Sequence, residues 1–479
     1  MDTSNQPSIL WHDYETWGAS PKHDHPSQFA AIRTDLDLNP IGDPANFYCY
    51  PPADYLPNPE ACLITGITPQ LTFAKGTNQH LFMQKVMKQM LQANTCSAGY
   101  NTLRFDDEVT RYSAYRNLME PYAREWKNGN SRWDIIDMVR ACFALRPEGI
   151  EWPEREDGAP SFKLELLSQA NGLEHANAHD ALSDVWATIG MAKLIKTKQP
   201  KLYQYLWELR DKRKVAELID EQNLVPLVHT SSKISAFQGC TTWIVPVAWH
   251  PVNKNAFIAL NLALDPEPLL NMTTDDIANL LFSKEEDLME GESRLPIKLI
   301  HTNKCPVLAP AKTLTEENAE RLGIDRATCL KNLAFIKQHQ QQISQSLIDF
   351  YTQQEFEEEK DVDHMLYSGF FNQSDVQLMN QLHQMPIEQL VNSSPAFSDN
   401  RLQQLWFRFK ARNYPESLAA QELTKWQLHC QEKLTGNSNK GCLNAQEFVT
   451  DLENLTRNGK LSDEKMAILK ALYDYVSQM

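Results

Sequence analysis

The sequence predicts an α/β chain with three parts: a mixed sheet flanked by helices, a β-rich middle part and a helical end. Three observations predict this fold class. Short apolar runs open the chain and then alternate with helical patterns, strand-like runs return between residues 241 and 302, and helical spacing dominates beyond residue 360. At roughly 150 residues per domain, 479 residues correspond to about three domains. We predict these domains at 1–197, 198–353 and 354–479.

The first part is expected to combine short buried strands with amphipathic helices. Ile9-Leu10-Trp11 predicts a strand that ends in the polar segment His12-Asp13-Tyr14-Glu15. Phe82, Val86 and Met90 recur every four residues, which is the spacing of one helix face. We expect further strands at 28–34, 47–50 and 95–100, a Pro-rich loop at 51–69, and helices at 79–92, 107–118, 162–171 and 178–196.

Charged segments separate the remaining parts. A basic stretch at 196–214 is predicted to join two domains, and the charged run at 355–361 is interpreted as solvated surface that marks a second boundary. Between them we expect strands at 241–248, 256–262 and 297–302, an acidic patch at 285–292 and helices from residue 315. The last part is expected to end with a helix at 462–476.

The net charge limits the partners that the chain can bind. Its 46 basic and 62 acidic residues give a net charge of −16, which argues against a surface that coats nucleic acid or anionic membranes non-specifically. A nucleic-acid site must therefore be a local groove. The segment from 196 to 350 is close to neutral and is the least unfavourable to phosphate.

The cysteines and the N-terminal segment predict the compartment. Nine cysteines, without a CxxC pair, indicate neither a disulfide framework nor a structural zinc site, and they fit a reducing compartment. The N-terminus lacks the basic segment and apolar run of a signal peptide, and no stretch approaches the roughly 20 apolar residues of a membrane span. We expect a cytoplasmic protein without membrane contact, and a monomer.

Two carboxylates at the end of the first predicted strand form the first candidate site. Asp13 and Glu15 are two residues apart, so their side chains would point to the same side of a strand. Carboxylates held this close repel each other unless a proton or a cation lies between them. A hard divalent ion such as Mg2+ prefers oxygen ligands and would fit there. The alternative is an ordinary polar exit from the strand into a loop.

Two later segments offer partners for this pair. Asp106, Asp107 and Glu108 follow a predicted strand and begin a helix. For Asp107 and Glu108, helix capping and compensation of the helix dipole are the preferred interpretation. His179 and Asp184 would lie about 140° apart around a helix. Both can therefore border one site only if His179 sits near the start of the helix.

Together, Asp13, Glu15, Asp106, His179 and Asp184 provide four carboxylates and one imidazole. Two-metal phosphodiester hydrolysis needs such a set, because carboxylates hold two ions about 3.5–4 Å apart and a neutral imidazole can activate water as a base. Two other hypotheses stay open. A non-catalytic DNA-end binder should lack a carboxylate, and an HD phosphohydrolase needs further His ligands on neighbouring helices.

Longer motifs along the whole chain resemble known nucleases. In the first part they are His12-Asp13-Tyr14-Glu15-Thr16, Gln28-Phe29-Ala30-Ala31-Ile32-Arg33, Leu63-Ile64-Thr65-Gly66-Ile67-Thr68-Pro69, Arg104-Phe105-Asp106-Asp107-Glu108 and Asn177-Ala178-His179-Asp180-Ala181. Further along they are Ala144-Leu145-Arg146-Pro147-Glu148-Gly149-Ile150, Ala248-Trp249-His250-Pro251, Asn303-Lys304-Cys305-Pro306-Val307-Leu308 and Ser368-Gly369-Phe370-Phe371. On these residues the chain resembles the DEDDh 3′→5′ exonucleases and, more narrowly, the bacterial exonuclease I family of single-strand-specific exodeoxyribonucleases.

The resemblance implies a fold and a reaction. The fold would combine a ribonuclease H-like exonuclease domain, an SH3-like middle domain with added helices and a helical C-terminal domain, around a groove for single-stranded DNA. Asp13 would bridge two Mg2+ ions, with Mn2+ as a substitute, and Glu15, Asp106 and Asp184 would complete their ligands. His179 would deprotonate the attacking water, and 5′-mononucleotides would leave from a free 3′ end during DNA repair and recombination. An RNA-directed DEDDh exonuclease is the related alternative.

The resemblance also implies residues that hold DNA. These are Glu15, Arg111, Arg140, Asn255, Lys298 and Asn303, with Tyr122 and Trp126 as stacking partners. Core packing is the alternative role for Tyr122. Lys163 stands where the best-known member of the family has Arg, a change that keeps the charge but loses the bidentate hydrogen bonding of a guanidinium.

A protein partner is implied as well. Members of the family bind the acidic, Phe-ending C-terminal tail of single-stranded DNA-binding protein in a basic pocket beside the groove. Arg146 and Lys337 fall at two positions of that pocket, whereas Thr315 replaces a third basic residue. We therefore expect this partner, with one contact fewer.

Overall fold

The chain forms two compact units. The computed structural model describes residues 6–173, 180–283, 294–354, 357–436, 441–458 and 461–478. Unit one contains residues 1–131, 175–186 and 358–479, and unit two contains residues 132–174 and 187–357. The first and last parts of the sequence therefore fold together.

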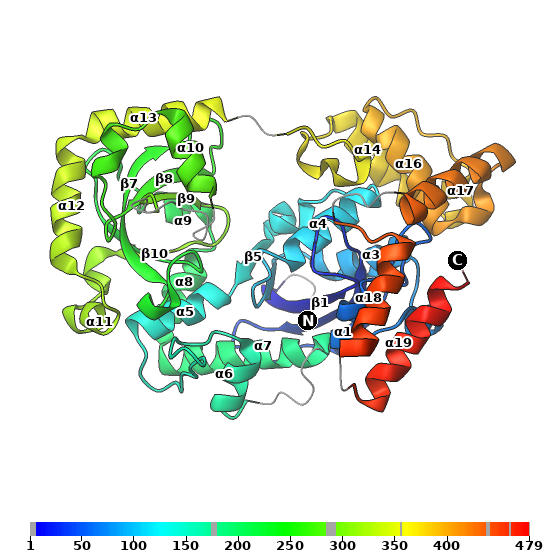
Figure 1. Cartoon of the computed structure of the whole chain (residues 1–479), viewed down its shortest axis with the longest axis horizontal. Helices are drawn as coiled ribbons and strands as arrows, with labels where there is room; N and C mark the ends of the chain where they lie inside the picture. The colour runs from blue at the N-terminus through cyan, green and yellow to red at the C-terminus, as the bar shows by residue number, and fades with distance from the viewer. Residues whose placement is uncertain are drawn as a thin grey trace. The chain divides into compact units, whose positions relative to one another are not determined.

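Unit one is built on a mixed sheet (Figure 1). Its strands β1 (Ser8–Thr16), β2 (Pro26–Thr34), β3 (Ala45–Tyr48) and β4 (Thr95–Gly99) lie in the order β3-β2-β1-β4. β1 is antiparallel to β2 and parallel to β4, and β2 is antiparallel to β3. The predicted mixed sheet is confirmed. A further strand, β5 (Ser131–Asp134), begins where the chain passes from unit one to unit two.

β1 continues beyond the end of its parallel neighbour. The last paired residues are Trp11 and Ala98, so residues 12–16 extend past β4. Gly99 permits the close approach at this point, because a Cβ atom there would lie 2.7 Å from the carbonyl oxygen of His12. The chain that leaves β4 can therefore turn close to β1, and the helix that follows begins beside Tyr14.

Helices α3 (Gln79–Met90) and α4 (Asp106–Arg116) pack on this sheet. Phe82, Val86 and Met90 of α3 share a buried core with Leu10 and Phe29 of the sheet, as the four-residue spacing predicted. Buried apolar surface stabilises a fold by roughly 25 cal/mol per Å2. This core therefore holds α3 and the neighbouring α4 against β1.

A helix interrupts the segment that was predicted to be a Pro-rich loop. α1 (Pro59–Thr65) lies within residues 51–69, so the prediction of a continuous loop is wrong. The side chain of Asn58 accepts a hydrogen bond of 3.1 Å from the backbone of the first turn, and Pro59 needs no N–H donor there. Gly66, with a φ of 71°, ends the helix. A second short helix, α2 (Pro69–Lys75), follows.

The C-terminal part of unit one is helical, as predicted. Its helices are α14 (Gln373–Leu382), α15 (Ile387–Val391), α16 (Asn400–Asn413), α17 (Ala420–Thr435), α18 (Ala445–Asn458) and α19 (Asp463–Val476). Phe448 and Leu472 of α18 and α19 share a core with Trp17 and Leu63 of the N-terminal part. Apolar packing therefore joins the two ends of the chain.

The charged run at 355–361 is partly structural. Glu359 lies 2.5 Å from Lys22, and Asp361 forms ion pairs with Arg408 and, at 2.9 Å, with Lys433. The interpretation as solvated surface holds for Glu357, Glu358 and Lys360, which are exposed, whereas Glu359 and Asp361 are half-buried because distant parts of the chain supply their cationic partners. Residues 355 and 356 lie outside the described residues.

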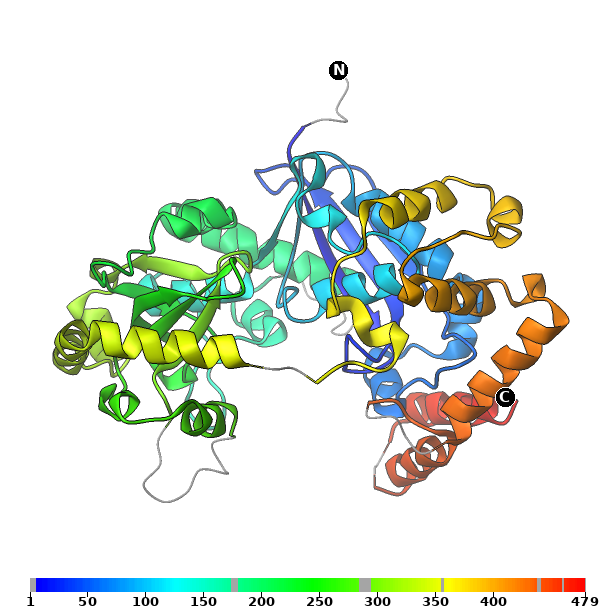
Figure 2. The same cartoon turned by 90° about the horizontal axis from the view of Figure 1, so that it is seen from above.

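Unit two is built on an antiparallel sheet, which confirms the predicted β-rich middle part. Its strands β6 (Leu227–Thr230), β7 (Thr241–Trp249), β8 (Ala256–Asn261), β9 (Ile297–His301) and β10 (Val307–Pro310) lie in the order β10-β6-β7-β8-β9. Helix α13 (Gln340–Gln353, yellow) lies against these strands (green) in Figure 2, and Ser344 donates to the carbonyl of Val247 at 2.9 Å. The predicted acidic patch at 285–292 lies outside the described residues.

The other helices of unit two cover or extend this sheet. They are α5 (Ile136–Leu145), α6 (Leu164–Ala170), α8 (Pro200–Glu208), α9 (Lys212–Ala216), α10 (Thr274–Phe282), α11 (Glu316–Arg321) and α12 (Arg326–Gln338). α7 (Ala181–Lys198) begins in unit one and ends in unit two. The basic stretch at 196–214 is largely helical, because it contains the end of α7, all of α8 and the start of α9.

The described residues also form seven short 3-10 segments, and those used below are η2 (Ala123–Glu125) and η8 (Val362–Tyr367). Across the described part of the chain, we find no helix that combines the length and the apolar character needed to cross a membrane.

Candidate functional site

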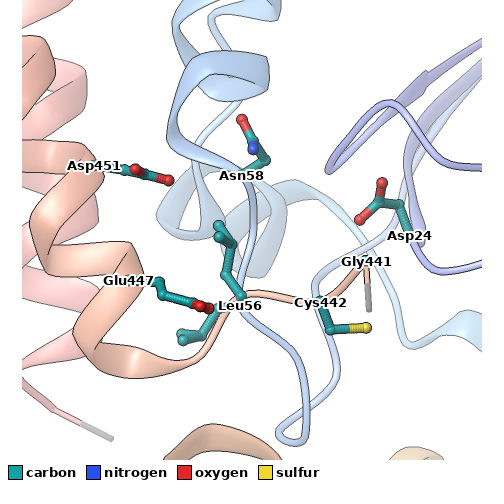
Figure 3. Close-up of a pocket in the computed structure, with 8 residues that line it drawn as sticks. Asp24, Leu56, Asn58, Gly441, Cys442, Glu447 and Asp451 are labelled. Carbon is teal, nitrogen blue, oxygen red and sulfur yellow. The ribbon is translucent and has the colours of Figure 1, made fainter. Parts of the chain in front are cut away.

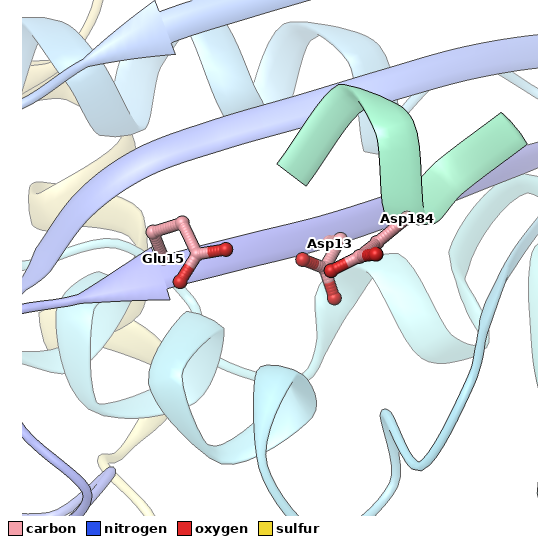
Figure 4. Close-up of side chains that lie close together, drawn as sticks. All are labelled: Asp13, Glu15 and Asp184. Carbon is pink, nitrogen blue, oxygen red and sulfur yellow. The ribbon is translucent and has the colours of Figure 1, made fainter. Parts of the chain in front are cut away.

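Three carboxylates converge at the C-terminal end of β1 (Figure 4). Asp13, Glu15 and Asp184 each offer one oxygen, and these oxygens lie within 4.8 Å of one another. Asp13 and Glu15 alternate with buried residues along β1, while Asp184 comes from the first turn of α7. The period of two in the strand and the start of one helix thus create the group.

Asp106 lies beside this group. It is the first residue of α4, its side chain is almost fully buried, and its Oδ1 accepts a hydrogen bond of 2.9 Å from the backbone N–H of Tyr14. Because Tyr14 stands between Asp13 and Glu15 in β1, this bond places Asp106 next to both. Four of the five residues predicted for catalysis are therefore brought to one place.

Burial and mutual repulsion shift the protonation of these carboxylates. Burial raises the pKa of Asp13 well above its usual range, and the negative charges of its neighbours, Asp106 first, raise it further. Burial also raises the pKa of Glu15 to about 8, with Asp184 as the strongest charged neighbour. Divalent cations remove such repulsion and prefer oxygen ligands. The residues present therefore fit a divalent metal centre.

Asp180 adds a further carboxylate that sequence reasoning did not assign to the site. Its Oδ1 accepts a hydrogen bond of 3.3 Å from Gln28, and its charge raises the pKa of both Asp13 and Glu15. Gln28 is paired with Glu15 in the register of β1 and β2. The only indication in the sequence that Asp180 belongs to this site is its position directly after His179, and that position does not show where the Asp180 side chain points.

His179 lies outside the described residues. It immediately precedes Asp180, and α7 begins at Ala181. In the sequence His179 stands two residues before the first residue of α7, and the prediction of its catalytic role falls outside the described residues.

The carboxylate group bears on the two competing hypotheses. Among the described residues, the His, Cys, Asp and Glu side chains grouped closely enough to hold a metal are Asp13, Glu15 and Asp184. This group does not contain the His ligands that an HD phosphohydrolase needs. A non-catalytic DNA-end binder should lack one of the catalytic carboxylates, and none of them is missing from this chain.

Asp107 and Glu108 form ion pairs rather than helix caps. The N-cap residue of α4 is Phe105, which makes no side-chain capping bond. Asp107 lies 2.5 Å from Arg124, and Glu108 lies 2.5 Å from Arg111. The capping role predicted for both residues is therefore wrong. Both residues do stand in the first turn of α4, where their negative charges interact favourably with the helix dipole, as predicted.

The DNA contacts predicted in unit one differ in their exposure. Arg111 is buried, and it donates to both carboxylate oxygens of Glu125 at 2.8 and 3.0 Å. Its guanidinium lies 5.2 Å from the ring centre of Tyr122, which is half-buried and meets Phe370 edge to face. Trp126 is 63% exposed. Trp126 therefore offers an open aromatic face, whereas Tyr122 is partly occupied by packing.

In unit two, Arg140 lies in the middle of α5 and Lys163 directly precedes α6. Arg140 in α5 pairs with Asp137 at 2.6 Å, and its guanidinium faces the ring of Phe162. Lys163 is the exposed residue directly before α6. Arg140 is therefore partly engaged by neighbouring side chains, whereas Lys163 is open to solvent.

The other three predicted contacts of unit two lie at or near β8 and β9. Asn255 accepts a hydrogen bond of 2.9 Å from Lys212, and the ammonium group of Lys298 donates to the carbonyl of Lys233 at 3.0 Å. Asn303 is exposed just after β9. β8 and β9 are antiparallel neighbours in which Ala256 pairs with His301 and Ala259 pairs with Lys298. Asn255 and Asn303 therefore stand near one end of this strand pair, and Lys298 lies further along it.

The residues predicted for partner binding lie on different elements of unit two. Arg146 follows α5 and lines a pocket of about 500 Å3 together with Leu145, Pro200, Lys201, Tyr205 and Val307. Lys337 is an exposed residue of α12 and is not among the lining residues. Thr315 caps α11 by accepting a hydrogen bond from the backbone of Asn318 at 3.2 Å. Lys201 is a pocket cation that sequence reasoning missed.

A second pocket, of about 480 Å3, lies in unit one (Figure 3). Asp24, Glu447 and Asp451 line it together with Asn58 and Cys442. Three carboxylates at its wall repel phosphate groups. This pocket therefore does not suit nucleic acid.

Family models match nearly the whole chain. Residues 10–191 match the model described as exonuclease, residues 210–353 match the exonuclease I SH3-like domain, and residues 360–479 match the exonuclease I C-terminal domain. These matches confirm the predicted combination of a ribonuclease H-like exonuclease domain with an SH3-like domain and a helical C-terminal domain.

Curated relatives are similar over their full length. Exodeoxyribonuclease I of Haemophilus influenzae is 46% identical over 470 residues, which are 98% of this chain and 98% of the relative. Exodeoxyribonuclease I of Escherichia coli is 45% identical over 478 residues, which are 100% of this chain and 99% of the relative.

Solved structures show the same likeness. Escherichia coli exonuclease I in complex with a dA16 oligonucleotide has a TM-score of 0.94 at 45% identity, over 99% of this chain and 100% of that chain. The zinc-bound form of the Escherichia coli complex with single-stranded DNA has a TM-score of 0.93 at 45% identity, over 99% of both chains. A structure of SSB/exonuclease I with the inhibitor CFAM has a TM-score of 0.91 at 44% identity, over 99% of this chain and 100% of that chain.

Proposed function

Because the chain belongs to the exodeoxyribonuclease I family, we propose that it hydrolyses single-stranded DNA stepwise from the 3′ end and releases 5′-mononucleotides. It is a single-strand-specific 3′→5′ exodeoxyribonuclease. The observation that carries this conclusion is the carboxylate group of Asp13, Glu15 and Asp184, in a chain that is similar to such enzymes from end to end.

The carboxylates are proposed to hold two Mg2+ ions. Asp13 would be a ligand of both ions, and Glu15, Asp106 and Asp184 would complete the two sets directly or through water. Two such ions, when bound, supply positive charge for the attacking and leaving oxygens of the phosphodiester. The raised pKa of Asp13 supports the proposal, because a cation in this place would relieve repulsion that the metal-free protein bears. Mn2+ accepts the same oxygen ligands and is expected to substitute.

His179 is proposed to be the general base. The imidazole would take the proton of the water that attacks the terminal phosphodiester and would then carry it away as imidazolium. Two facts support this role: His179 directly precedes Asp180, whose charge acts on Asp13 and Glu15, and it stands five residues before Asp184.

The substrate is proposed to be held by cations and aromatic rings. Trp126 is the best-placed stacking residue, since its exposed face can receive any base. Lys163 would contact a phosphate near the 3′ end as a point charge. Arg111, Arg140, Asn255, Lys298 and Asn303 would contribute further polar contacts, and Glu15 would meet the terminal nucleotide.

The pocket beside Arg146 is proposed to receive the C-terminal tail of single-stranded DNA-binding protein. A terminal Phe would place its ring between Leu145, Tyr205 and Val307, and the tail carboxylates would face Arg146 and Lys201. Lys337 would act outside the pocket on the acidic residues that precede the Phe. Titration of a fluorescent acidic peptide against the protein and an Arg146→Ala variant tests this assignment.

One experiment tests the activity and its alternatives. The protein is incubated with Mg2+ and matched oligomers that carry a 3′ label: single-stranded DNA, duplex DNA and single-stranded RNA. We expect mononucleotides mainly from single-stranded DNA. Faster release from RNA would support an RNA-directed enzyme, whereas tight DNA binding without release would support a non-catalytic end binder.

The activity suggests a cellular role. Removal of single strands from 3′ ends is a step of DNA repair and recombination, and we propose that this protein performs it as a cytoplasmic monomer. The nine cysteines include no CxxC pair, a pattern that suits a reducing compartment.

A further inference from the structure

Two ion pairs join the 3-10 turn η2 to α4. In one pair η2 supplies the cation, and in the other it supplies the carboxylate. Nη2 of Arg124 donates to Oδ1 of Asp107 at 2.5 Å. The next residue, Glu125, accepts hydrogen bonds from Nε and Nη2 of Arg111 at 2.8 and 3.0 Å. Because Asp107 and Arg111 are four residues apart, the two pairs hold one face of the first turns of α4.

The pair between Arg124 and Asp107 is closed to solvent. The two side chains are 0% and 2% exposed. Loss of the guanidinium would leave the carboxylate of Asp107 buried without this compensating charge. The start of α4 would then shift toward water or toward another cation, and the residues beside Asp107 would move with it.

Asp106, the neighbour of Asp107, is attached to β1. Its carboxylate accepts from the N–H of Tyr14, and its carbonyl accepts from the hydroxyl of Thr110 at 2.8 Å. The same hydroxyl lies 3.1 Å from the hydroxyl of Tyr14. The first turn of α4 is thus fixed to β1 through Asp106 and to η2 through Asp107.

We propose that Arg124 is a positioning residue for the metal centre. Through Asp107 it holds the first turn of α4 in the place where Asp106 can join Asp13 and Glu15 around divalent cations. The inference rests on the proposed function, because it assumes that these carboxylates bind metal. Arg124 itself touches neither the cations nor the DNA in this role.

The test separates metal binding from folding and from DNA binding. Mn2+ binding to the full-length protein without DNA is measured by electron paramagnetic resonance for the wild type, Arg124→Met and Arg124→Lys. Affinity for a single-stranded oligomer is measured in EDTA on the same samples. Arg155→Met is the matched control, because Arg155 forms an exposed ion pair with Asp157.

We expect Arg124→Met to weaken Mn2+ binding at least tenfold while oligomer affinity in EDTA stays within about twofold. Arg124→Lys should recover most of the Mn2+ affinity, and Arg155→Met should change neither quantity. Unchanged Mn2+ affinity in folded Arg124→Met would overturn the inference, as would an equal loss of Mn2+ and oligomer affinity.

A second variant covers the case in which Arg124→Met does not fold. Asp107→Asn keeps the shape of the side chain but removes the charge that Arg124 holds. Weaker Mn2+ binding in Asp107→Asn supports the inference, and wild-type Mn2+ affinity overturns it. Failure of the wild type to bind Mn2+ or to degrade single-stranded DNA would instead contradict the proposed function.

Discussion

Arg412 and Asp54 form a buried bidentate ion pair although 358 positions separate them in the sequence. Nε and Nη2 of the guanidinium lie 3.0 and 2.7 Å from the two carboxylate oxygens, and the side chains are 6% and 1% exposed. The same guanidinium also binds Asp363 in η8. The pair therefore ties α16 to the segment that follows β3, within unit one.

Loss of this pair should strongly destabilise unit one. Arg412→Ala leaves Asp54 and Asp363 buried without their shared cation, and we expect the free energy of unfolding to fall by about 3–5 kcal/mol. Chemical denaturation followed by circular dichroism measures the change. Arg213→Ala is the control, since that guanidinium is 84% exposed and its loss should leave the denaturation midpoint unchanged. Equal midpoints for Arg412→Ala and the wild type would contradict the prediction.

The same network should make unit one sensitive to acid. Burial alone would raise the pKa of Asp363, but the charges of Arg412 and Arg408 outweigh it and hold the pKa well below its usual range. A carboxyl group with a lowered folded-state pKa stabilises the fold above its unfolded pKa of about 4 and loses that contribution as the pH falls further. We expect the melting temperature to drop below about pH 4. In Asp363→Asn it should be lower at pH 7, with a shallower fall in acid.

The metal-site carboxylates should behave in the opposite way. Burial and the charge of Asp184 raise the pKa of Glu15 to about 8, so Glu15 stays protonated in the metal-free fold while the same carboxyl group ionises in the unfolded chain above about pH 4. The metal-free fold therefore loses stability as the pH rises from about 4 to about 8. Glu15→Gln should therefore raise the melting temperature in EDTA at pH 8, and this gain should disappear as the pH falls toward 4. Nuclease activity should drop by roughly 10^3-fold, because Glu15 is proposed to be a metal ligand. A lower melting temperature at pH 8 would contradict this assignment.

His179→Ala should reduce turnover far more than DNA affinity. A general base contributes about 10^2–10^4-fold to the rate, and we expect a loss of that size in kcat with little change in oligomer binding. In the wild type, turnover should rise with pH through roughly 6.5, the ordinary imidazole value. A flat profile between about pH 5.5 and 8, or an equal loss of affinity and turnover in the variant, would exclude this role.

Trp126→Ala should weaken binding of single-stranded DNA. Stacking of one base on an aromatic ring contributes about 1–3 kcal/mol, which corresponds to a loss of about 5- to 150-fold in affinity. Trp126→Phe should recover much of it. Phe237 is 59% exposed on unit two and has no proposed DNA contact, so Phe237→Ala is the matched control. Fluorescence anisotropy of a labelled oligomer in EDTA measures all three variants.

Local patterns predicted most of the elements. The apolar run before His12 is β1, and the four-residue spacing around Val86 is α3. The prediction failed at α1, where the density of Pro residues concealed two ordinary helix signals: Asn58 as the N-cap and Gly66 at the C-terminal end. It failed again for Asp107, because the position in the first turn suggested a helix cap while the compensating charge comes from Arg124.

The sequence by itself determined that Asp13 and Glu15 share one side of a strand, because side chains alternate along any strand. It also placed Asp106 at the start of a helix and Asp184 within the helix predicted at 178–196, whereas only the structure, in which α7 begins at Ala181, puts Asp184 in the first turn. Only the tertiary structure decided that Asp184 reaches Asp13, that Asp180 joins them, and that Arg124 and Arg412 meet their buried carboxylates. The reason is physical: the distance between charges on different elements depends on how their apolar faces pack, and no local pattern records that packing.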